Sequence, residues 1–300
     1  MRLHTSIRET RSDRILNGIV YVVAILLIAV TAYPLYFIII ASISDPELVA
    51  YGKVFLVPQK ISLAAYQEVF KRSDIWVSYR NTIFYATAGT LWNMALTIPA
   101  AYALSKKRLH GRSFFLFFIT FTMYFSGGMI PSYINIKNLH LLNTWAVLIV
   151  SSGVSAYNLI IAKTFFSSSV PAELEEAATI DGCGIFKTFL VIVLPISKAM
   201  LAVIMLYYLV GHWNSYTNAL IYLSGAQEKW PLALVLRNIL VRSQVELSEE
   251  QDAMEVARYA QLVNLLKYAL IVVSSLPLMI FYPIIQKSFE KGILLGSIKG

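Results

Sequence analysis

The stretch that decides the fold is Ile15–Ser44, ILNGIVYVVAILLIAVTAYPLYFIIIASIS, which runs for 30 residues without a single Lys, Arg, Asp or Glu. A helix that crosses about 30 Å of hydrocarbon needs ~20 residues at ~1.5 Å each. The apolar core of a cleaved signal peptide has only ~7–15 residues. We therefore expect this stretch to be a retained first membrane span.

Five more stretches have the same character and are also long enough to cross a bilayer. Four of them carry no charge, and the last carries only Lys267: Asn81–Ser105, Ser113–Ile136, Leu141–Ala162, Ala199–Gln227 and Tyr259–Gln286. Apolar residues make up 57% of the 300 residues and charged residues 14%, against the ~25% charged that is usual in soluble domains. The sequence predicts an all-α polytopic membrane protein with six transmembrane helices.

The distribution of charge predicts which side of the membrane each segment faces. Six spans place both termini on one side, and the segments on that side carry 14 basic and 7 acidic residues: 1–14, 105–112, 163–198 and 287–300. The opposite segments, 43–80, 132–141 and 223–258, carry 10 of each. Cytoplasmic loops are enriched in Lys and Arg, so we expect both termini in the cytoplasm. The net charge of +8 then reflects membrane topology and not nucleic-acid binding.

These boundaries define one transmembrane domain, 15–286, between a cytoplasmic N-terminal segment, 1–14, and a cytoplasmic tail, 287–300. The domain includes outer segments 43–80 and 223–258. It also includes the long cytoplasmic insertion 163–198.

The insertion 163–198 contains the most specific pattern in the chain. Pro171 suits a first helical turn, acidic side chains follow at 173, 175 and 176, and Gly182 suits the end of a helix. This predicts a helix of about ten residues with Leu174, Ala177 and Ala178 on one side. Such a short helix does not persist alone, so we expect it to dock on a partner.

The motif resembles the cytoplasmic coupling loop of ABC importer permeases. It pairs Glu-Ala-Ala and a glycine with a later Ile-x-Leu-Pro, met here by Glu176, Ala177, Ala178, Gly182, Ile192, Leu194 and Pro195. Residues 282–300 resemble the tail of the carbohydrate-uptake permeases, and Gly211–Tyr216 resembles their Trp-Asn signature in the fifth span. Phe125–Pro131 is similar to the subgroup that takes up complex oligosaccharides.

The resemblance implies a type I ABC importer permease in a bacterial plasma (inner) membrane. Such a chain pairs with a second, related permease, two ATPase subunits and an external solute-binding protein that delivers the oligosaccharide. The chain has no Gly-x4-Gly-Lys-Ser/Thr phosphate loop, so we expect a non-catalytic subunit whose ATPase partners bind ATP and Mg. The residues expected to couple to the ATPase are Glu175, Glu176, Ala177, Ala178, Asp181, Gly182, Leu194 and Pro195.

Polar and aromatic side chains within the apolar spans are the candidates for the sugar path. They are Tyr124, Tyr133, Trp213, Asn214, Tyr216 and Asn218. Each also has a structural interpretation, because intramembrane Asn bridges helices and Tyr and Trp favour the headgroup region. Lys267 either faces the cavity or extends to the interface.

Other functions remain as alternatives at this point. The chain could carry a non-sugar solute such as a peptide or polyol, or form a six-span channel. An intramembrane enzyme is disfavoured because Lys267 is the lone Lys, Arg, Asp or Glu within the spans, and such an enzyme needs paired groups. The four histidines lie on separate segments and Cys183 is the sole cysteine, so no metal site is expected.

Overall fold

The structure is a computed structural model that describes residues 10–245 and 266–280. Within those residues the regular structure is helical and contains no strand. The described residues divide into two compact units, one formed by residues 10–71 and 266–273 and the other by 72–245 and 274–280. The tail motif at 282–300 lies outside the described residues.

The first unit begins with a long apolar helix, α1 (Arg11–Ser42). Thr10 and Asp13 cap it reciprocally, since each side chain hydrogen-bonds the other's backbone N–H, at 3.2 Å and 2.9 Å. This helix of 32 residues is long and apolar enough to cross a membrane, as predicted. Beyond it lie α2 (Pro46–Ala50) and α3 (Ala64–Lys71).

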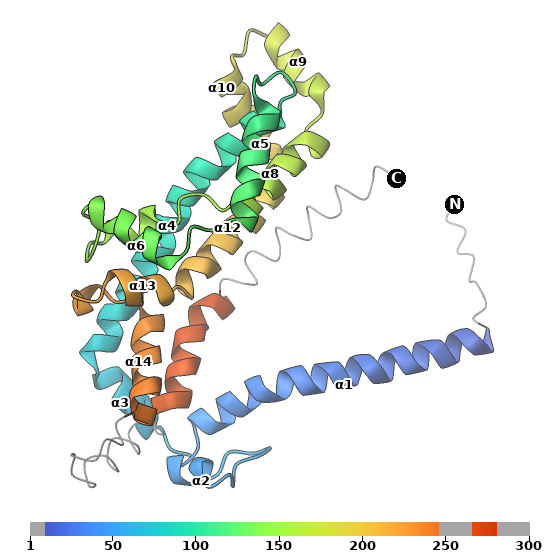
Figure 1. Cartoon of the computed structure of the whole chain (residues 1–300). Coiled ribbons are helices and arrows are strands. Elements are labelled where there is room, and N and C mark those ends of the chain that lie inside the picture. The colour runs from blue at the N-terminus through green and yellow to red at the C-terminus, as the bar shows by residue number, and fades with distance from the viewer. Residues whose placement is uncertain (1–9, 246–265, 281–300) are drawn as a thin grey trace. The chain divides into compact units, whose positions relative to one another are not determined.

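The core of the second unit is a bundle of α4 (Ser73–Ser105), α8 (Ala156–Ser169) and α12 (Lys198–Trp213), which pack against one another (Figure 1). Helix α4 begins eight residues before the predicted span. Small residues let the helices approach closely, and Ala101 and Ala162 are fully buried at the centre of the packing.

The fourth predicted span is broken into α7 (Ala146–Val150) and α8, and side chains of neighbouring helices satisfy the backbone at the break. The amide of Asn93 on α4 donates to the carbonyls of Ser152 and Gly153, the latter at 2.8 Å. The oxygen of the same amide lies 2.6 Å from His212 Nε2 on α12. Backbone polar groups that lose their partners at a helix break are costly inside a membrane, and the hydrogen bonds from Asn93 satisfy two of them.

The third predicted span is also broken. Its two pieces, α5 (Arg112–Tyr124) and α6 (Met129–Asn138), are bent by 116°. Gly128 precedes α6 with a φ of +89°, a conformation that glycine adopts without the steric cost that other residues incur. The apolar run Ser113–Ile136 has no charge to mark this break, which lies at Gly127-Gly128.

The fifth span is preceded by a bend of 84° between Ile185–Ile196 and α12. The first of these pieces consists of α10 (Ile185–Thr188), the π-helix η1 (Phe189–Val193) and α11 (Leu194–Ile196). After α12 come α13 (Thr217–Tyr222), η2 (Gln227–Lys229) and α14 (Leu232–Val245), and the described part of the sixth span is Leu266–Ile280. Within the described residues one helix, or up to three segments if each bent pair is a single span, passes the length and apolarity criterion. The count of six therefore stays a prediction.

Candidate functional site

The short helix expected in the insertion is α9 (Ala172–Ile180), at one end of the second unit in Figure 1. Pro171 caps it from just outside rather than lying in its first turn. Gly182 follows with a φ of +76°, and the next amide, of Cys183, donates 2.8 Å back to the carbonyl of Ala178. This αL glycine with a backward hydrogen bond ends the helix, as the sequence predicts.

One side of α9 is attached to the rest of the chain. Ala178 is buried, and the carboxylate of Glu175 forms an ion pair with Lys106, just past the end of α4. Tyr102 on α4 donates its hydroxyl to the same carboxylate at 3.2 Å, and Lys106 Nζ lies 4.2 Å from the centroid of the Tyr102 ring. Glu175 therefore anchors α9 to α4 within the chain.

The other side of α9 is open. Four of the predicted coupling residues are exposed there: Glu176, Ala177, Asp181 and Gly182. Large apolar side chains flank them, with Ile180 86% exposed, Ile185 80% and Phe186 76%. An apolar patch rimmed by charge at the end of a helical unit is typical of a protein–protein interface.

Leu194 and Pro195, the last two predicted coupling residues, lie where the chain turns into α12. The N–H of Leu194 bonds to the carbonyl of Phe189, five residues earlier, which is the π-helical pattern. Pro195 has no N–H to continue the helix, and the chain bends before α12 starts. These residues shape the connection between α9 and α12, and they do not lie on the exposed patch of α9.

The predicted sugar-path residues do not form one cluster. Trp213 is buried, its indole N–H donates 3.1 Å to the carbonyl of Ser274, and its ring meets Tyr79 edge-on at 6.1 Å. That indole links the end of α12 to the last described helix. Sugar contact at Trp213 stays a prediction.

The other five candidates are spread over two regions. Tyr124 is 86% exposed at the end of α5, and Tyr133 on α6 stacks on Tyr222 of α13 at 6.4 Å. The remaining three, Asn214, Tyr216 and Asn218, follow α12, and of these Asn214 and Tyr216 are exposed and Asn218 is half-buried. Lys267 is exposed with its Nζ 5.4 Å from the Tyr268 ring centroid.

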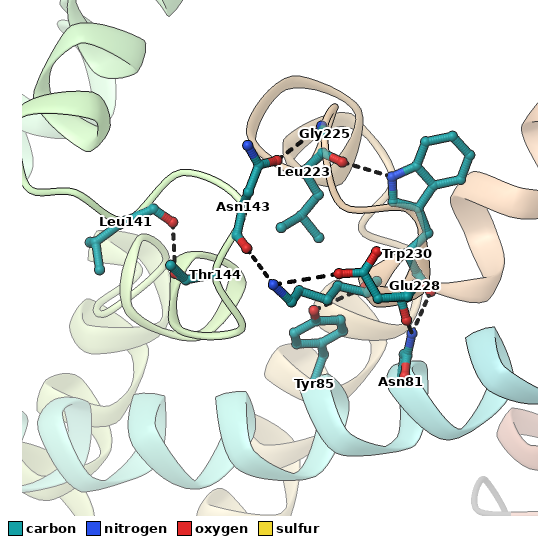
Figure 2. A network of polar contacts seen from close by, with 10 residues as sticks. Asn81, Tyr85, Leu141, Asn143, Thr144, Leu223, Gly225, Glu228 and Trp230 are labelled. Atoms are coloured by element: carbon teal, nitrogen blue, oxygen red, sulfur yellow. Dashed lines mark hydrogen bonds and ion pairs between the residues drawn. The ribbon is translucent and has the colours of Figure 1, made fainter.

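A polar network that the sequence analysis missed holds the segment between α13 and α14 against α4 (Figure 2). The amide of Asn81 donates to the carbonyls of Glu228 and Trp230, at 2.8 and 3.0 Å. The Asn143 side chain accepts from the Gly225 amide at 3.0 Å. Asparagines inside a charge-free run were the available signal, because intramembrane amides bridge helices.

The described residues contain no group of three or more His, Cys, Asp or Glu able to hold a metal ion. The anchor between Lys106 and Glu175 was also missed at the sequence level. No local pattern pairs residues that are 69 positions apart in the sequence.

Comparison with known proteins decides the family. The model of the binding-protein-dependent transport system inner membrane component family matches residues 6–295. The chain belongs to this family. It is 38% identical over 291 residues to the polygalacturonan/rhamnogalacturonan transport system permease protein YtcP of Bacillus subtilis (strain 168), covering 96% of this chain and 99% of the relative. It is also 39% identical over 272 residues to protein LplC of the same organism, covering 91% and 90%.

A solved structure agrees with this membership. It is a bacterial ABC transporter involved in the import of the acidic polysaccharide alginate, and one of its chains matches with a TM-score of 0.84 and 35% identity, covering 94% of this chain and 99% of that one. This inner membrane component therefore has an ABC importer permease fold. It is the non-catalytic membrane subunit of an ATP-driven importer, in which separate subunits hydrolyse ATP. The finding supports an importer over a channel.

Proposed function

We propose that this permease takes up oligosaccharides that an external solute-binding protein delivers. The single observation that supports this most strongly is the likeness over nearly the whole chain to a permease named for polygalacturonan and rhamnogalacturonan. A more distant relative, 25% identical, is named for melibiose, raffinose and stachyose, which carry no carboxylate. Neutral and carboxylated sugars therefore both stay within the proposed class.

The exposed face of α9, from Glu176 to Gly182, would dock on an ATPase subunit that binds ATP and Mg. A related second permease and a second ATPase subunit would complete the membrane assembly. This arrangement requires α9 and both termini to lie in the cytoplasm, as the charge distribution predicts.

The contacts of α9 suggest how ATPase closure would reach the membrane spans. The ion pair of Glu175 with Lys106 ties α9 to the end of α4, and the bent segment through Pro195 connects it to α12. Since α4 and α12 pack on each other, a movement of α9 would act on both helices together. Alternating access needs such a two-state element with different contacts in each state.

The test is ATPase stimulation in the reconstituted complex by binding protein loaded with oligosaccharide. Glu176→Lys reverses a charge on the exposed face, and replacing Gly182 by a bulky residue alters the end of α9. We expect both variants to insert and assemble but to lose most of the stimulation. Full stimulation in both would contradict the coupling role, and a peptide or polyol that stimulates where no oligosaccharide does would contradict the sugar class.

A further inference from the structure

The chain between α12 and α13 brings polar groups into the middle of an apolar span. Residues 214–216 are not helical, yet they lie inside Ala199–Gln227, which carries no charge. Asn214 and Tyr216 are exposed there, and Tyr216 is 42% exposed. Irregular backbone at membrane depth is tolerated where protein buries it or where it lines water. Asn214 and Tyr216 belong to such an irregular stretch, and this chain does not bury them, so the stretch is suited to line a water-filled path.

A cation lies beside this surface. The guanidinium carbon of Arg237, on α14, is 5.9 Å from the centroid of the Tyr216 ring, and the arginine is half-buried. The ion pairs found within residues 10–245 and 266–280 use Lys71, Arg72, Lys106 and Lys229 as their cations. Arg237 has no carboxylate partner within that part of the chain. A half-buried guanidinium that pairs with no carboxylate of the described residues is suited to receive one from a ligand.

We propose that Arg237 and Tyr216 form a subsite for a carboxylated sugar unit, so that the cargo is an acidic oligosaccharide. This rests on the proposed function and narrows it. The planar guanidinium presents paired N–H donors that match the two oxygens of a carboxylate, and a lysine does not reproduce that geometry. The exposed tyrosine ring offers a flat face to the C–H side of the same sugar ring.

The position of the pair agrees with such a role. Arg237 lies in the first half of α14, which follows the polar network of Figure 2 and packs on α4. Tyr216 directly precedes α13. A cargo that enters from the outer side would meet the cation and the ring together, because two successive helices hold them on one surface.

The experiment uses the full complex with its binding protein in proteoliposomes and measures initial uptake of trigalacturonate and of its methyl ester. The ester keeps the sugar rings and removes the negative charges. Arg237→Gln should lower uptake of the acid relative to the ester about tenfold, because a charge-assisted contact is lost. For Arg237→Lys we expect a ratio of acid uptake to ester uptake between that of the wild type and that of Arg237→Gln. Arg80→Gln, which removes an exposed cation from the same outer side, should leave the ratio unchanged.

Tyr216→Phe keeps the ring and should transport both cargoes, whereas Tyr216→Leu should slow both. Equal losses of acid and ester in Arg237→Gln would overturn the subsite and indicate a lipid or packing role. The subsite is also overturned if Arg237→Gln and Arg80→Gln take up the acid equally well. If the wild type takes up the acid and not the ester, this comparison of the two variants is the test. Uptake of the ester but not the acid by the wild type would refute the subsite and leave the oligosaccharide function standing. Uptake of no oligosaccharide would refute both.

Discussion

Glu175 provides a sharp test of how α9 is held, because it belongs to the coupling motif but faces its own chain. The side chains of Lys106 and Glu175 are 31% and 23% exposed, so the pair is neither at the surface nor fully buried. Surface pairs contribute about 0.2–1 kcal/mol, and removing one partner of a buried pair costs about 3–5 kcal/mol. We expect Glu175→Gln to cost about 1–2 kcal/mol of α9 anchoring, which corresponds to roughly a 5–30-fold change in an equilibrium.

The assay is the affinity of the ATPase subunit for the permease pair in nanodiscs. Glu175→Gln should weaken binding by about that factor, because α9 is presented in its docking orientation less of the time. Glu173→Gln removes an exposed acid from the same first turn and serves as the control. The exchange Lys106→Glu with Glu175→Lys should recover most of the affinity. If Glu175 touched the ATPase directly, the charge exchange would not restore binding. Equal ATPase affinity of Glu175→Gln and Glu173→Gln would show that the ion pair with Lys106 does not position α9.

Substitutions at two glycines test the packing of α4 on α12 and the end of α9. A Cβ added at Gly89 would overlap the imidazole of His212, so Gly89→Ala must displace that ring from Asn93. Overpacking of about 1–3 kcal/mol, offset by about 1 kcal/mol of helix propensity, should lower stability by up to about 2 kcal/mol in a reversible detergent unfolding titration. Adding His212→Ala should recover part of the loss, and a gain of about 1 kcal/mol for Gly89→Ala alone, the effect of helix propensity without overpacking, would refute the close packing. At Gly182, valine should cost about 1–2 kcal/mol because of the positive φ, while asparagine should be tolerated better. Stimulated ATPase activity should fall in that order, and equal activity in both variants would argue against the αL requirement.

The sequence predicted well where local chemistry decides the structure. The charge-free run at Ile15–Ser44 became one helix, since nothing interrupts its apolar pattern. The short helix α9 followed from Pro171, its acidic first turn and Gly182, all of which act on their own backbone.

Prediction from the sequence was weaker where contacts between residues distant in the sequence decide the structure. The third apolar run looks continuous, yet it bends by 116°. At the break in the fourth run, Asn93 on another helix donates hydrogen bonds to the free carbonyls. A hydropathy value averaged over a run of residues does not reveal such breaks. The division of the coupling motif into an anchored side, with Glu175, and an exposed side, with Glu176, likewise depends on a contact with Lys106 that no spacing rule encodes.

The most direct test of the account is cross-linking from α9 to an ATPase subunit. The measurement uses Ile180→Cys, at a position 86% exposed, in a Cys183→Ser background that removes the native thiol. With a short thiol cross-linker and an ATPase subunit that carries one cysteine in its docking cleft, we expect a covalent permease–ATPase pair in the assembled complex. A complex that transports cargo but yields no such pair from this position would contradict docking through the exposed face of α9.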